Sequence, residues 1–383
     1  MKILHTSDWH LGRSFHGVGL LDAQAAYVDH VLDVVASEQV DLVVVSGDIY
    51  DRGLPPVDAV AVFHDALSRL AASRARVVIT SGNHDSAQRL GFASGLIDTA
   101  GIHLRTNAAD VATPVVLNDS EGPVAVYGIP YLDPDVMRRA WDLGSRSHEA
   151  ALSEAMRRIR TDLSGRGGTR SIVMAHAFVA GGQPSDSERD IAVGGVSRIP
   201  TGIFDGIDYA ALGHLHGQQV LSERVRYCGS PLAYSFSEAG HVKGSWLVDL
   251  RADSIHTDFV AAPVARSLVR LRGELAELLV DPELSHAERS WVQVTLTDAV
   301  RPRFPMDQLR SRFPHTLSLL FDPVGASQPA HRRSTKGRSD LEVVTDFVEH
   351  VRGGPASDAE LALLRDAVES CCGVPEADSL VGS

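Results

Sequence analysis

Apolar and polar positions in the first part of the chain follow a strand–loop–helix order. Short apolar runs at 2–6, 42–45 and 76–80 have the length and β-branched content of buried parallel strands. Segments 22–38 and 55–73 follow the first two runs, and the first of them places its apolar residues at helical spacing. Since strand, helix and strand in this order form right-handed crossovers, the pattern predicts a parallel sheet with helices packed on it.

The middle of the chain varies this pattern. A mostly helical, arginine-rich segment is expected at 133–160, and a glycine-rich charged loop at 181–195. Further strands are predicted at 124–130, 171–175, 209–212, 226–231, 245–250 and 255–260. The last two would complete a sheet.

After Pro263 the pattern changes to short strands separated by short helices, at 267–271, 291–296 and 316–320. The expected organisation is one domain over 1–262, a small α+β domain over 263–325, a basic linker over 326–338 and a helical tail over 339–383.

Two amphipathic helices are predicted in this tail. The first presents Phe347 and Val351 on its apolar face, and the second presents Leu361 and Leu364. Two short helices beyond a linker cannot bury both faces alone, so they either dock back on the body or bind a partner.

Composition and charge narrow the class of protein. Of the 383 residues, 44% are hydrophobic and 22% charged, which is typical of a globular protein. No apolar run approaches the ~20 residues of a membrane span, and the first residues are expected to form a strand. The three cysteines form neither a disulfide framework nor a zinc ligand set, which favours a reducing cytoplasm. The net charge of −13 argues against a free-standing nucleic-acid binder.

Oxygen and imidazole donors follow five of the predicted strands. The set is Asp8, His10, Asp48, Asn83, His84, His176, His214 and His216. Ligands of open α/β sheets bind just beyond the carboxyl ends of strands. Any one of these residues is as well explained as a turn former, a helix cap or a core histidine, and it is their recurrence that indicates a site. Carboxylate and imidazole without thiolate suit Mn, Fe or Zn.

Two metal ions ~4 Å apart could activate one bridging water for attack on a phosphoester. Asp8 and His10 are two apart in an extended segment and are expected to grip one metal together, and the same argument applies to His214 and His216. Asp48 is the candidate bridge, because each carboxylate oxygen can serve one cation. Two divalent cations would exceed the charge of the two carboxylates, and the surplus would favour a phosphate.

The motifs S-D-W-H-L-G, G-D-I-Y-D, G-N-H-D and G-H-L-H occur in this order, with His176 between the last two. They resemble the motifs of calcineurin-like metallophosphoesterases. The resemblance implies a β-sandwich flanked by helices, with a small α+β capping domain and a C-terminal helical tail. H-T-S-D-W-H-L-G, S-E-R-D-I and R-Y-C-G-S-P-L-A-Y-S-F-S-E resemble, more narrowly, the nuclease subunits of bacterial SbcC–SbcD complexes. The motifs lie within residues 1–260, and the remainder matches by layout only.

The resemblance also assigns ligands. It implies one metal held by Asp8, His10, Asp48 and His216, and a second held by Asp48, Asn83, His176 and His214. It makes His84 a general acid or phosphate contact at the leaving oxygen rather than a ligand. Asp51 is placed either to orient His84 through its carboxylate or to cap the turn.

One departure concerns the substrate. Asp51-Arg52-Gly53 is closer to the protein phosphatases of the same superfamily, in which the arginine grips a phosphate. Arg52 either does so here or is a solvated surface charge. Against the phosphatase interpretation, Asp85 follows His84, where those enzymes have Glu.

The function implied by the resemblance is that of a DNA nuclease subunit with two divalent ions, most plausibly Mn2+. It would cut double-stranded ends as an exonuclease and hairpins as an endonuclease, in DNA repair and recombination at the nucleoid. An SbcC-type ATPase is the expected partner of the tail at 339–372, and a homodimer is common in the family. Arginines at 138–139 and 157–160 are either DNA contacts or solvated helix faces. The alternatives are a phosphoesterase acting on a small phosphodiester or a phosphoprotein, and a non-catalytic scaffold.

Overall fold

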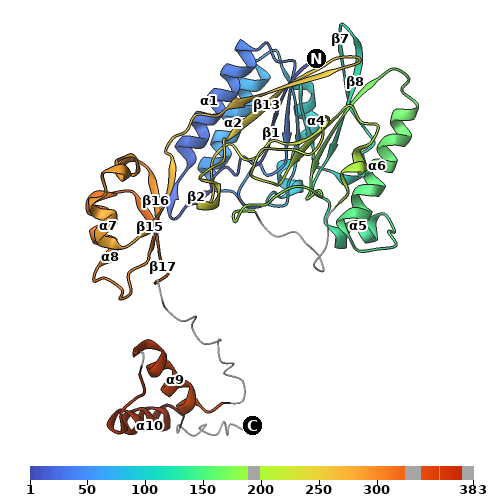
Figure 1. Cartoon of the computed structure of the whole chain (residues 1–383). Coiled ribbons are helices and arrows are strands. Elements are labelled where there is room, and N and C mark those ends of the chain that lie inside the picture. The colour runs from blue at the N-terminus through green and yellow to red at the C-terminus, as the bar shows by residue number, and fades with distance from the viewer. Residues whose placement is uncertain (189–198, 324–337, 353, 373–383) are drawn as a thin grey trace, which may run out of the picture. The chain divides into compact units, whose positions relative to one another are not determined.

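The computed structural model describes residues 1–188, 199–323, 338–352 and 354–372 (Figure 1). The chain divides into two compact units, Met1–Asp322 and Pro323–Ser383. Each unit is described by itself.

The first unit contains a six-stranded sheet in the order β14-β13-β1-β4-β5-β6. Its strands are β1 (Lys2–Thr6), β4 (Leu42–Ser46), β5 (Arg76–Thr80), β6 (Ile102–Arg105), β13 (Gly244–Leu250) and β14 (Ile255–Ala261). Strands β1, β4, β5 and β6 pair in parallel. Strand β13 pairs antiparallel with β1, and β14 pairs antiparallel with β13. Helices α1 (Leu21–Ser37) and α2 (Val57–Ala71) make the first crossovers, as the periodicity predicts.

A second six-stranded sheet has the order β11-β12-β10-β9-β8-β7. Its strands are β7 (Val115–Asp119), β8 (Gly122–Ile129), β9 (Arg170–His176), β10 (Tyr209–Gly213), β11 (Gln219–Val220) and β12 (Val225–Tyr227). Helices α5 (Pro134–Ala140) and α6 (His148–Ser164) lie between β8 and β9 and pack on this sheet.

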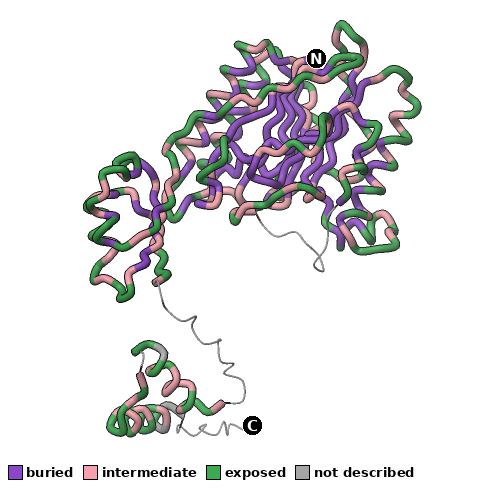
Figure 2. Tube along the Cα trace, in the orientation of Figure 1, coloured by how far each residue is buried: buried purple, intermediate pink, exposed green. Residues whose placement is uncertain are grey.

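The two sheets face each other across a shared apolar layer. Ile3 and Val44 from the first sheet belong to the same buried cluster as Val126 and Met174 from the second. The outer faces are covered by α1 and α2 on one side and by α6 on the other. Figure 2 shows the central strands buried throughout, which is why they are continuous apolar runs rather than alternating ones. The structure confirms the predicted β-sandwich flanked by helices.

Several short elements were not predicted. Strands β6 and β7 lie at sheet edges, and their burial alternates, so their apolar signal is weak. Others include the strands β2 (Ser14–Phe15), β3 (Val18–Gly19) and β11, and the helices α3 (Ala87–Leu90) and α4 (Ser94–Ile97).

The last part of the first unit is a small α+β domain with its own core. Its strands β15 (Leu268–Gly273), β16 (Trp291–Leu296) and β17 (Thr316–Phe321) form a parallel sheet, and its helices are α7 (Leu275–Val280) and α8 (Pro305–Arg312). Leu271, Val294 and Phe313 are buried in its core. Phe236 from the preceding part of the chain belongs to a second cluster, against which Trp291 packs.

The second unit contains α9 (Asp340–Arg352) and α10 (Asp358–Cys372). Helix α10 begins with a capping box, in which the Glu360 carboxylate accepts from both Ser357 N and Oγ. None of the residues whose burial is described in this unit is buried, and Phe347 and Val351 are 64% and 67% exposed. Most of the predicted linker at 326–338 falls outside the described residues. No helix in the described part of the chain is long and apolar enough to cross a membrane.

Candidate metal centre

The predicted ligands converge at one edge of the sandwich. Strands β1, β4 and β5 of one sheet and β9 and β10 of the other deliver them from their carboxyl ends. All are buried except Asn83, which is half-buried. So many buried polar groups in one place need partners, and a bound cation is one way to satisfy them.

Asp48 lies at the centre of the group. Its Oδ2 is 3.6 Å from His10 Nε2 and 3.4 Å from His176 Nε2. The first cluster comprises Asp8, His10, Asp48 and His216, in which the Nε2 atoms of His10 and His216 are 3.1 Å apart. Ligand atoms of Asp8, His10 and His216 all lie within 4.8 Å of one another.

The second cluster comprises Asp48, Asn83, His176 and His214. The Oδ1 atom of Asn83 is 2.9 Å from His176 Nε2 and 3.2 Å from His214 Nδ1. Asp48 also contributes ligand atoms to a group with Asp8 and His176. Asp48 therefore belongs to both clusters, as a bridging carboxylate would.

The structure separates His214 from His216. The spacing argument expected both to grip one metal, but His216 faces His10 while His214 faces Asn83. The reason is local, because His214 has a φ of 102° and the segment is not extended there. This division matches the ligand sets implied by the family resemblance.

Unusual backbone conformations concentrate here. Asp8, His10 and Asp48 have φ values of 54°, 46° and 49°, in the left-handed region that non-glycine residues seldom occupy. Such strain persists at sites whose surroundings over-determine it. Gly82 permits a close approach, because a Cβ there would lie 2.1 Å from Asp48 Oδ1.

Backbone carbonyls orient two of the histidines. His176 Nδ1 lies 2.9 Å from Ser46 O, and His84 Nδ1 lies 2.7 Å from Asp51 O. We predicted that the Asp51 carboxylate orients His84, but that carboxylate is 4.0 Å from His84 Nδ1. The atom of Asp51 that contacts His84 is its main-chain carbonyl oxygen. Asp51 Oδ1 is closer to His10 Nδ1, at 3.7 Å, because the turn after β4 points the side chain toward His10.

Burial and neighbouring charges shift the pKa values of several side chains in this site. Burial lowers the pKa of His10 and of His214 well below the usual value, so both rings are neutral with a lone pair available. Burial opposes ionisation of Asp48, but the neighbouring His176 holds the pKa of this carboxyl well below the usual range. Facing imidazole nitrogens 3.1 Å apart beside an ionised carboxylate form a donor set that fits divalent metal ions.

Comparison with known proteins agrees with this geometry. The model of the family described as calcineurin-like phosphoesterase matches residues 1–218. The chain belongs to this family. Its members hydrolyse phosphoesters with divalent metal ions, and the described residues contain the corresponding candidate ligand groups. A second model, SbcD_C, described as type 5 capsule protein repressor C-terminal domain, matches residues 264–352.

Three solved structures match this chain at low identity. The protein TT1561 of Thermus thermophilus has a TM-score of 0.40 at 13% identity, covering 67% of this chain and 98% of that one. A dimetal phosphatase from Danio rerio has a TM-score of 0.43 at 12% identity, covering 69% and 97%. An archaeal phosphodiesterase has a TM-score of 0.31 at 11% identity, covering 68% and 100%.

Three residues near the metallophosphoesterase centre were not predicted to act there. The Asp85 carboxylate accepts hydrogen bonds from Ile49 N, Tyr50 N and Gly82 N, so it ties the loop after β4 to the loop after β5. Its only sequence signal is its place at the end of G-N-H-D. The Glu188 carboxylate accepts from His216 N. The Glu238 carboxylate contacts Ser187 Oγ, which lies next to His216 Nδ1. Glu188 lies within S-E-R-D-I, and Glu238 is the last residue of R-Y-C-G-S-P-L-A-Y-S-F-S-E. Both motifs resemble those of the family, but no role was predicted for either residue.

Arg52 lies at the surface. It is 64% exposed at the side chain, and its Nη2 is 3.8 Å from Asp51 Oδ2. Arg13 is more enclosed: its Nη2 donates to Ser187 O at 2.9 Å, and its guanidinium lies over the Tyr234 ring at 4.8 Å. Arg13 is therefore held in place by more contacts than Arg52, although only Arg52 belongs to a motif that predicted a phosphate contact.

Proposed function

We propose that this metallophosphoesterase is a metal-dependent DNA nuclease subunit that hydrolyses phosphodiesters in duplex ends and hairpins. The observation that carries the chemistry is the position of Asp48 Oδ2 between His10 Nε2 and His176 Nε2. The choice of DNA is supported by the narrower motif resemblance and by the SbcD_C match at 264–352.

The first and second clusters would each hold one ion, with Asp48 shared between them. When bound, two divalent ions, most plausibly Mn2+, would supply an activated water and neutralise charge on the phosphate. His84 is proposed as the general acid. Its Nδ1 is directed to the Asp51 carbonyl, so Nε2 is the nitrogen that would deliver a proton to the leaving oxygen. Asp51 is a positioning residue in this scheme, and Arg52 is a proposed phosphate contact.

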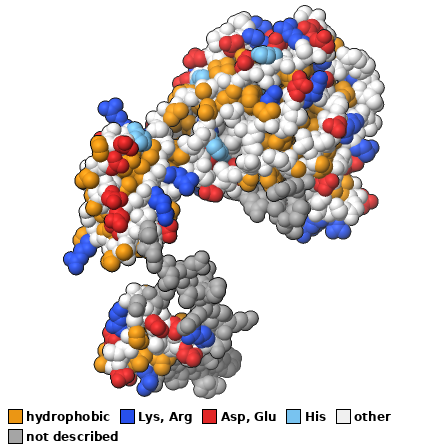
Figure 3. Space-filling model, viewed as in Figure 1, with side chains coloured by type: hydrophobic (Ala, Val, Ile, Leu, Met, Phe, Trp, Pro, Cys, Tyr) orange, Lys and Arg blue, Asp and Glu red, His pale blue; other side chains and the backbone are white. Residues whose placement is uncertain are grey.

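The negative charge of the chain has to be reconciled with DNA. Arg157 and Arg158 both pair with Glu154, and Arg160 donates to main-chain carbonyls, which favours their role as helix-face residues. On the face shown in Figure 3, acidic and basic side chains are interspersed. Since phosphate contacts supply most non-specific affinity, we propose that the metal centre and the ATPase partner provide much of the binding.

A paired assay tests this function. Purified chain with Mn2+ is given a hairpin-ended DNA duplex and, separately, a generic phosphodiester such as bis-p-nitrophenyl phosphate. We expect the duplex to be cut in a Mn2+-dependent manner and the His84→Gln variant to lose most of this activity. Cleavage of the small ester alone, with or without an SbcC-type ATPase, would overturn the nuclease proposal and leave the phosphoesterase alternative.

The tail is the proposed contact with the ATPase. Phe347, Val351 and Leu363 are all more than 60% exposed in the second unit, although they are large apolar side chains. Deleting residues after 337 should abolish co-purification with an SbcC-type ATPase and spare Mn2+-dependent hydrolysis of the small ester. Retained co-purification would show that the partner binds elsewhere.

A further inference from the structure

His216 is supported from behind by a chain of side chains. Its Nε2 faces His10 Nε2 at 3.1 Å, and its Nδ1 lies 2.5 Å from Ser187 Oγ. Ser187 Oγ in turn contacts the Glu238 carboxylate. An ionised carboxylate can only accept, so the Ser187 proton points to Glu238 and His216 Nδ1–H donates to Ser187. This order leaves the Nε2 lone pair directed into the first cluster.

Glu238 is fixed at the far end of this chain. It is 1% exposed, and its Oε2 lies 2.5 Å from Lys243 Nζ. This contact with a buried ammonium group indicates that the Glu238 carboxylate is ionised, so it can only accept hydrogen bonds.

The main chain of His216 is held by the same group of residues. Lys243 Nζ donates to His216 O at 2.7 Å, and Glu188 Oε1 accepts from His216 N at 2.7 Å. Ser185 Oγ donates to Glu188 Oε2 at 2.7 Å, and it also lies 3.1 Å from Glu238 Oε1. Both the ring and the backbone of His216 therefore depend on charged side chains.

The other histidines oriented at this site are held differently. His176 and His84 direct Nδ1 to the carbonyls of Ser46 and Asp51, which no substitution of those residues' side chains would remove. Support of a metal-binding histidine by a hydrogen bond to its second ring nitrogen fixes the tautomer and strengthens the ligand. At His216 alone among these three, a side-chain substitution can remove that bond.

We propose that Ser187 and Glu238 are positioning residues that hold His216 in the tautomer and orientation needed by the first cluster. The inference rests on the proposed metal centre and deepens it. Removing the Ser187 hydroxyl should weaken the first cluster and leave the second cluster intact, because no part of the second cluster contacts Ser187 through a described hydrogen bond.

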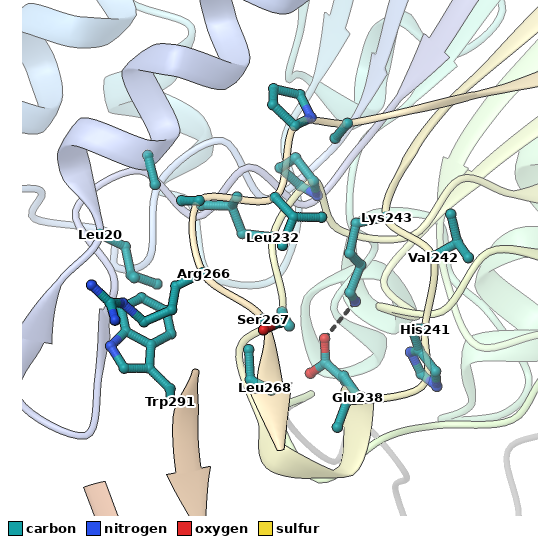
Figure 4. A pocket seen from close by; sticks show the side chains of 18 of the residues that line it. Leu20, Leu232, Glu238, His241, Val242, Lys243, Arg266, Ser267, Leu268 and Trp291 are labelled. Carbon is teal, nitrogen blue, oxygen red and sulfur yellow. Dashed lines mark hydrogen bonds and ion pairs between the residues drawn. The ribbon is translucent and has the colours of Figure 1, made fainter. Parts of the chain in front are cut away.

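The Glu238–Lys243 pair also forms part of a crevice wall. Figure 4 shows the ion pair beside a crevice of about 260 Å³ that Leu232, Leu268 and Trp291 also line. Glu238 is the last residue of the short helix η4 (Phe236–Glu238), whose Phe236 lies in the cluster that contacts the α+β domain. One short helix thus supports the metal ligand and contacts the α+β domain, so the test needs a change that leaves η4 itself untouched.

Ser187→Ala is that change. Mn2+ binding to the full chain is measured by isothermal titration calorimetry, with thermal unfolding followed by circular dichroism. We expect about a 10- to 100-fold loss of affinity for one of two Mn2+ equivalents, with the second equivalent and the unfolding midpoint close to wild type. Ser187→Thr keeps the hydroxyl and should restore binding.

Ser185→Ala is the matched control. This serine lies 3.0 Å from Ser187 Oγ and 3.1 Å from Glu238 Oε1 but does not contact the His216 ring, so we expect a much weaker loss of Mn2+ affinity. A metal-free readout separates positioning from general damage: nitrogen chemical shifts of the His216 ring should report the Nδ1–H tautomer in wild type and a mixture in Ser187→Ala.

Glu238→Gln examines the end of the chain. Because this change leaves Lys243 without its ion-pair partner, it is combined with Lys243→Met to remove the buried cation. The double variant should fold and lose affinity at one Mn2+ equivalent; because Lys243 also donates to His216 O, the nitrogen shifts of the His216 ring, rather than the affinity alone, report the loss of Glu238.

The outcomes separate the two proposals. A wild-type chain that binds no Mn2+ would overturn the metal centre itself. Two Mn2+ equivalents bound equally well by wild type and Ser187→Ala, with an unchanged His216 tautomer, would overturn the positioning role alone.

Discussion

The two sheets of the sandwich contribute different chemistry to the candidate metal centre. The first sheet supplies every oxygen donor, Asp8, Asp48 and Asn83, together with His10 and His84. The second sheet supplies imidazoles only, from His176, His214 and His216. All of the negative charge among these residues therefore comes from one sheet.

Hydrogen bonds across the interface place the second sheet's histidines relative to the first. His214 N donates to the Asp8 carboxylate at 3.1 Å, and His176 Nδ1 lies 2.9 Å from Ser46 O. Ser46 Oγ also donates to Ala211 O at 2.9 Å. Neither sheet holds a complete site, so a bound metal would act as a cross-link between them.

The largest effect is expected at the shared carboxylate. Asp48→Ala removes the bridge between the clusters and one of the two negative charges, so both Mn2+ equivalents should be lost together. We expect affinity to fall by more than about 100-fold, beyond the range for residues that only support a ligand. Calorimetric titration with Mn2+ measures this, and retention of one equivalent at wild-type affinity would show that Asp48 is not shared.

A substitution in the second sheet should be more selective. His214→Ala removes one neutral imidazole from the second cluster, while the first cluster keeps all its donors. The titration should show one equivalent weakened and one retained. Equal loss of both would mean that the division of His214 from His216 does not extend to the metals.

Metal binding itself should stabilise the sandwich. Because both sheets provide ligands, Mn2+ binds the folded state in preference to the unfolded one and adds about 2.7 kcal/mol at a hundredfold excess over Kd. The unfolding midpoint should rise by several degrees with Mn2+ and return on addition of EDTA. In Asp48→Ala the midpoint should not respond to Mn2+, which provides the control.

The smallest effect is expected for a contact between the two sheets that is not part of the candidate metal centre. Ser46→Ala removes the hydroxyl bond to Ala211 O but keeps the Ser46 carbonyl that orients His176. Stability should fall by about 1 kcal/mol, measured by urea unfolding, with Mn2+ affinity unchanged. A loss of affinity as well would indicate that the hydroxyl, and not only the carbonyl, sets the position of His176.

Local sequence determined much of the fold. The apolar runs that become β1, β4, β5, β9 and β10 are buried on both faces, so their composition alone identified them and the donors at their ends. Edge strands β6 and β7 were missed because their faces differ in burial and their apolar signal is diluted. The candidate ligand residues could be singled out from the sequence, since each follows a strand that is itself easy to recognise.

Only the tertiary structure decided how these residues are shared and supported. His10 and His216 are 206 positions apart, and the left-handed turn at His214 sends it to Asn83 instead. That Asp51 orients His84 through its carbonyl, and that Glu238 supports His216 through Ser187, depends on contacts between separate loops. Sequence patterns indicate which residues follow a strand, because periodicity depends on neighbouring positions in the chain. The partner that each donor atom meets is set by how the two sheets pack.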